Sequence, residues 1–89
     1  MSDGDSKSTF DYFTREYAEA LQAFETIEEQ SPTLLAFGGT EDLRAFLDQF
    51  ITMTGRAHDE AIEKSEPNFA EWFRELREKA EALRASLDA

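Results

Sequence analysis

The chain has 89 residues, a formal net charge of -11 and no cysteine. This length suffices for one domain and is too short for two, and the lack of cysteine excludes disulfides, thiolate metal sites and cysteine nucleophiles. The negative charge argues against direct binding to nucleic acid, whose phosphates are neutralised by Lys and Arg. Because 40% of the residues are hydrophobic, the chain can bury a core. No apolar run is long enough to span a membrane, so we expect no membrane partner.

The first eight residues are small and polar and show no periodicity. We therefore expect residues 1–8 to form a disordered tail and residues 9–89 to form a single helical domain. The same segment lacks the basic start and apolar core of a secretory signal peptide, so we expect a cytoplasmic protein.

From Thr9 onward, apolar residues recur every three or four positions, which is the period of one helix face. They are Phe10, Phe13, Tyr17, Leu21, Phe24 and Ile27. The pattern predicts a helix from about Phe10 to Gln30. We expect it to end at Ser31 and Pro32, because the proline ring clashes with a continuing helix.

The following segment, residues 32–39, is long enough for only one or two helical turns, with Gly38 as a left-handed terminator. It would add a short fourth helix to the bundle if it folded separately. Its apolar side chains are Leu34, Leu35 and Phe37. We favour the interpretation that they close one end of the core, and the alternative is a surface on which a partner docks.

Thr40 is the predicted N-cap of a second helix, whose apolar residues from Leu43 to Ile62 cover about half of its circumference. A face this wide must contact more than one neighbour, so we expect this helix at the centre of the bundle. Gly55 interrupts the helix at a cost of about 1 kcal/mol relative to Ala. We therefore expect a backbone or an aromatic ring to approach closely at Gly55, and the alternative is a bend of the helix at this position.

A third helix is predicted after Pro67, and Asn68 with Glu71 fits a capping box at its start, with Ser65 as a competing cap. Its apolar residues are Phe69, Trp72, Phe73, Leu76, Ala80, Leu83 and Leu87. From Phe73 their spacing alternates between three and four, which is the seam of a coiled coil. We expect this helix to run antiparallel to the second helix or to pair with a copy of itself.

Three basic side chains, Arg77, Lys79 and Arg84, flank this seam. They can lay their methylene groups on the core and reach carboxylates of a neighbouring helix. We favour pairing with the first helix of the same chain over pairing across a dimer. Trp72 belongs either to the core or to an interface.

The sequence offers no constellation for catalysis. His58 is the only histidine, and the residues three and four positions away from it include no hard metal ligand. Gly-rich phosphate-binding loops are missing, and nearly all acidic residues map to solvated helix faces. We therefore predict no catalytic, cofactor-binding or metal site and no enzymatic activity.

The sequence thus predicts an all-α fold, a small antiparallel bundle of three helices. We expect a non-catalytic protein–protein interaction module, such as an adaptor, regulator or accessory subunit, whose partner is another protein or a second copy in a homodimer. The candidate interface residues are Leu34, Leu35, Phe37, Trp72, Arg77, Lys79 and Arg84. The alternative is an acidic decoy or antitoxin-like inhibitor of a basic protein surface. Against this alternative, the acidic residues are spread over all segments of the chain.

Overall fold

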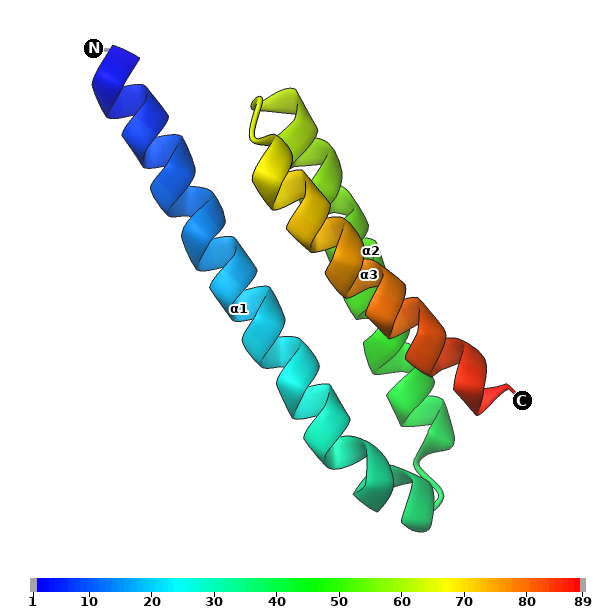
Figure 1. Ribbon diagram of the computed structural model, residues 1–89. Coiled ribbons are helices and arrows are strands. Elements are labelled where there is room, and N and C mark those ends of the chain that lie inside the picture. Colours follow the sequence, from blue (N-terminus) through cyan, green and yellow to red (C-terminus); the bar gives the residue numbers. More distant parts are fainter. Residues whose placement is uncertain (1, 89) are drawn as a thin grey trace.

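The structure, a computed structural model, describes residues 2–88 and the side chains of residues 9–88. It contains three helices, α1 (Ser2–Ala36), α2 (Thr40–Glu63) and α3 (Pro67–Leu87), and the described part of the chain has no strand. The all-α prediction is therefore confirmed. Figure 1 shows α2 and α3 packed along each other and α1 running beside this pair. None of these helices has the length and apolar character needed to cross a membrane.

Helix α1 is longer than predicted at both ends. It begins at Ser2 rather than near Phe10, while the division into a tail of residues 1–8 and a domain of residues 9–89 stays a prediction. At the other end it continues through Pro32 to Ala36, so the predicted end at Ser31 is wrong. The segment after Pro32 forms the last turn of α1, and the described chain has no fourth helix.

Packing explains why α1 continues past Pro32. The proline removes one backbone donor and bends the helix, and Figure 1 shows α1 changing direction near its end. The bent turn stays attached because Ser31 is buried and Leu34 packs against the core. Tertiary contacts thus outweigh the local preference for a break.

The turns after α1 and α2 follow backbone geometry more than side-chain capping. Gly38 has a φ of 81°, as expected of a left-handed terminator, and the Gly39 N–H donates to the Leu34 carbonyl. Thr40 and Asn68 are not N-caps, because Gly39 and Glu66 hold these positions without a side-chain hydrogen bond. At α3, Pro67 occupies the first helical position, where its missing N–H needs no partner.

One core lies between the three helices. Its buried apolar residues are Phe13, Ala20, Phe24, Leu43, Leu47, Phe50, Ala61, Phe69, Ala70, Phe73, Leu76 and Ala80. Helix α2 contacts both other helices, as predicted, and α1 also contacts α3. The predicted seam of α3 faces this core within one chain, since Phe73, Leu76 and Ala80 are buried.

Gly55 lies next to a side chain rather than to a backbone or a ring. A Cβ added there would lie 3.5 Å from Nη1 and 3.8 Å from Cδ of Arg77, which is ordinary van der Waals contact. The predicted close approach is therefore wrong. Because Gly lowers helix propensity by about 1 kcal/mol, we expect Gly55→Ala to raise the free energy of unfolding by about 0.5–1 kcal/mol, measured by urea denaturation.

Gly38→Ala is the matched control for this prediction. Its φ of 81° is a conformation that L-residues rarely adopt, so the same change should destabilise the protein. A loss of stability in Gly55→Ala would show that α2 needs glycine at this position.

Candidate functional site

The predicted interface residues do not form one surface. Of the three side chains that were predicted to close one end of the core, only Leu34 packs against it, so the prediction is wrong for Leu35 and Phe37. Leu35 and Phe37 lie beside it at the turn between α1 and α2 and are exposed, Phe37 to 85%. Trp72 lies near the start of α3, next to α1.

Trp72 belongs neither wholly to the core nor wholly to the surface. It is 42% exposed, and its ring centroid lies 5.4 Å from that of Tyr17 and 5.2 Å from that of Phe69. The ring centroid of Phe10 also lies 5.5 Å from that of Phe69, and Phe10 is about half exposed. The start of α3 and α1 thus share an aromatic cluster with two partly solvated rings.

Arg84 takes part in an ion-pair network between α2 and α3. Its Nε donates to Asp48 Oδ1 at 2.5 Å and its Nη1 to Asp88 Oδ2 at 2.9 Å, while Arg44 Nη2 lies 2.7 Å from Asp88 Oδ1. The hydrogen bond to Asp48 raises the pKa of Arg84 above its ordinary value. Arg84 therefore pairs within the chain, but its partner helix is α2 and not the predicted first helix.

The other two basic residues differ from Arg84. Arg77 Nε lies 3.8 Å from Glu81 Oε1 in its own helix, so it does not pair with the first helix either. Lys79 and Glu28 line a shallow depression between α3 and α1. Solvent-exposed ion pairs of this kind contribute at most about 1 kcal/mol each, so they do not determine the fold.

His58 lies at the edge of the bundle, where its Nδ1 is 3.2 Å from Asp59 Oδ1. Its side chain is 29% exposed. Among residues 2–88, no three or more His, Cys, Asp or Glu side chains lie close enough together to hold a metal ion. The absence of catalytic and cofactor-binding residues stays a prediction.

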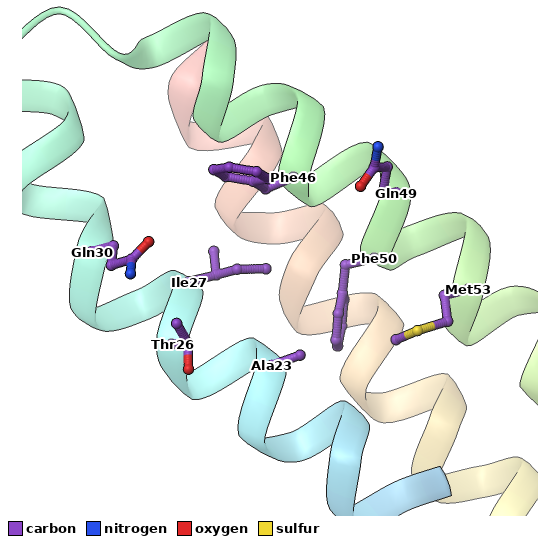
Figure 2. Close-up of a pocket in the computed structure, with 8 residues that line it drawn as sticks. All are labelled: Ala23, Thr26, Ile27, Gln30, Phe46, Gln49, Phe50 and Met53. Atoms are coloured by element: carbon purple, nitrogen blue, oxygen red, sulfur yellow. The ribbon is translucent and has the colours of Figure 1, made fainter.

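A groove of about 380 Å³ lies between α1 and α2 (Figure 2). Eight residues line it, four from each helix: Ala23, Thr26, Ile27, Gln30, Phe46, Gln49, Phe50 and Met53. Figure 2 shows Ile27 and Phe46 pointing into the space between the helices, while Gln49 points away from α1 at the rim. We call this surface the α1–α2 groove.

Phe50 forms the floor of the α1–α2 groove, and two neighbours on the same helix form its open side. Phe50 is buried, with its ring centroid 5.4 Å from that of Phe24. Phe46 and Met53 lie four residues before and three residues after Phe50, on a similar face of α2, and are 46% and 44% exposed. The described residues therefore leave both side chains partly open to solvent.

The α1–α2 groove is uncharged, whereas the helices that form it are strongly acidic. None of the eight lining residues carries a formal charge, although 33% of the chain is charged. Helix α1 has eight acidic and two basic residues and α2 has six and two, which gives net charges of -6 and -4. Helix α3 has four of each and is neutral. Acidic residues thus occur on all three helices, as predicted, but the net negative charge lies on α1 and α2.

Comparisons with protein-family models, with curated proteins and with solved structures gave no match.

Proposed function

We propose that this protein is a small acidic interaction module without catalytic activity, built as an antiparallel three-helix bundle, which acts in the cytoplasm by binding another protein. It would serve as an adaptor, a regulator or an accessory subunit. The exposure of Phe46 and Met53 in the α1–α2 groove carries this proposal. Large apolar side chains that line an uncharged groove offer a surface that a partner can bury.

The expected gain from covering these two side chains is large enough to matter. Full burial of a Phe or Met side chain stabilises by about 1.5–3 kcal/mol. Since each is already about half buried, a partner would gain about 1 kcal/mol from each. Together they would tighten binding by a factor of about 30.

None of the residues that line the α1–α2 groove is among the interface residues predicted from the sequence. Leu35, Phe37 and Trp72 remain secondary candidates because they are exposed at other places on the bundle. Arg84 is the weakest candidate, because two carboxylates of the same chain already accept its hydrogen bonds.

The second candidate function is an acidic decoy or antitoxin-like inhibitor that covers a basic protein surface. The charge of α1 and α2 favours it, because electrostatic complementarity speeds association with a basic partner. Binding of this kind would weaken strongly with added salt. It would not depend on Phe46 or Met53.

We expect the immobilised chain to retain specific proteins from an extract of its source cell, identified by mass spectrometry. The double variant Phe46→Gln/Met53→Gln should lose them, because it removes the exposed apolar side chains of the α1–α2 groove. Ile62→Gln is the matched control, since Ile62 is an exposed apolar residue of α2 outside the groove. Circular dichroism would confirm that each variant is folded.

Two results would contradict the groove as the binding surface. In the first, the unsubstituted protein, the double variant and Ile62→Gln retain the same proteins at all salt concentrations. In the second, retention is independent of the substitutions but disappears on raising salt from about 0.1 to 1 M, over which the Debye length falls from about 10 to 3 Å. The second result would support the acidic decoy.

A further inference from the structure

We propose that the occupant of the α1–α2 groove is an amphipathic helix of a partner protein, with a short apolar face and basic flanks. This inference rests on the proposed function. The length of the apolar lining, its lack of charge and the acidity of both flanking helices each specify one part of this ligand.

The length of the groove fits about two turns of helix. Its lining extends from Ala23 to Gln30 on α1 and from Phe46 to Met53 on α2. At 1.5 Å per residue, each segment is about 10 Å long. A helix placed there would be the fourth member of a bundle and would bury three or four apolar side chains spaced at i, i+3, i+4 and i+7.

The polar residues that line the groove need no charged group of the ligand as a hydrogen-bond partner. Thr26, Gln30 and Gln49 are neutral and, with their exposed side chains, can exchange hydrogen bonds with water or with a ligand. The centre of the ligand is therefore apolar or neutral, and its charges belong at its edges.

The surroundings of the groove favour positive charge at these edges. The depression that continues from Met53 along the two helices is lined by Glu16 and Glu60 with one cation, Arg56. Both helices that form the groove are also negative overall, with net charges of -6 on α1 and -4 on α2. Lys and Arg flanking the apolar face of a bound helix would be attracted to both sides.

A second copy of this chain does not meet this description. Its α1 and α2 would bring the same negative charge to the contact, and its α3 has equal numbers of acidic and basic residues. The apolar seam of α3 is also already buried in its own chain. The basic residues that flank this seam therefore have no free apolar face between them that could enter the groove of another copy.

The test uses three labelled peptides of about 18 residues, long enough to form a helix, and fluorescence anisotropy with the full chain. Two of them have Leu at the spacing i, i+3, i+4 and i+7 and either Lys or Glu at all remaining positions. The third has the same composition as the Leu–Lys peptide, but in scrambled order. We expect the Leu–Lys helix to bind most tightly. Phe46→Gln/Met53→Gln should weaken its binding at least about tenfold, and Ile62→Gln less than about twofold.

Each other outcome overturns the inference in a recognisable way. Equal, groove-dependent binding of the Leu–Glu helix would show a groove that binds helices regardless of their charge, and the proposed function would survive. Equal binding of the scrambled peptide, unaffected by Phe46→Gln/Met53→Gln, would show attraction by charge alone and favour the acidic decoy. Sedimentation equilibrium could show that the unsubstituted chain is a dimer and that the double variant is a monomer. This result would identify a second copy as the occupant.

Discussion

Phe73→Ala is expected to lower the free energy of unfolding by about 3–5 kcal/mol. The Phe73 side chain is 1% exposed and makes an edge contact with Tyr17, so its removal leaves a cavity where α3 meets α1. Small domains are stable by only about 5–15 kcal/mol, so this loss is a large part of the total. Urea denaturation followed by circular dichroism measures it.

Phe37→Ala is the matched control, because it removes the same ring from a position that is 85% exposed. We expect its effect to stay within about 0.5 kcal/mol. Similar losses in both variants would mean that Phe37 is covered in solution, and equally small effects would mean that the core is not packed around Phe73.

Pro32→Ala is expected to raise the free energy of unfolding by about 1–3 kcal/mol. The alanine restores the backbone donor to the Glu28 carbonyl and removes the clash of the ring with this group, while the greater freedom of the unfolded chain offsets part of the gain. Pro32 is exposed, so little packing is lost. Denaturation in urea is again the measurement.

Thr33→Ala in the same turn is the control, since Thr33 is also exposed and its replacement leaves the proline in place. It should change stability by less than about 0.5 kcal/mol. A loss of stability in Pro32→Ala would show that the bend is required to bring Leu34 onto the core.

The sequence predicted the helices well because their signals are local. The apolar period, Gly38 and Pro67 act within a few residues, and the structure has helices and turns where these signals indicate them. The predicted end of the first helix was wrong because the burial of Ser31 and Leu34 keeps a bent helix intact beyond Pro32. This packing depends on α2 and α3 and cannot be read from the residues around the proline.

The α1–α2 groove could be predicted only in part. The broad apolar face of the second helix includes Phe46, Phe50 and Met53, and its width indicated contact with more than one neighbour. Periodicity does not show which part of such a face remains uncovered. That depends on where α1 crosses α2, so Phe50 is buried while the other two are about half exposed.

The described residues form a rod of 53 × 18 × 15 Å with a radius of gyration of 15.1 Å, whereas a compact chain of this length would have about 12 Å. A particle with an axial ratio of about 3 diffuses more slowly and leaves a gel-filtration column earlier than a sphere of equal mass. A single 10.2 kDa chain will therefore elute like a heavier globular protein. Early elution is thus no sign of a homodimer, and the number of subunits must be determined from the molar mass by light scattering.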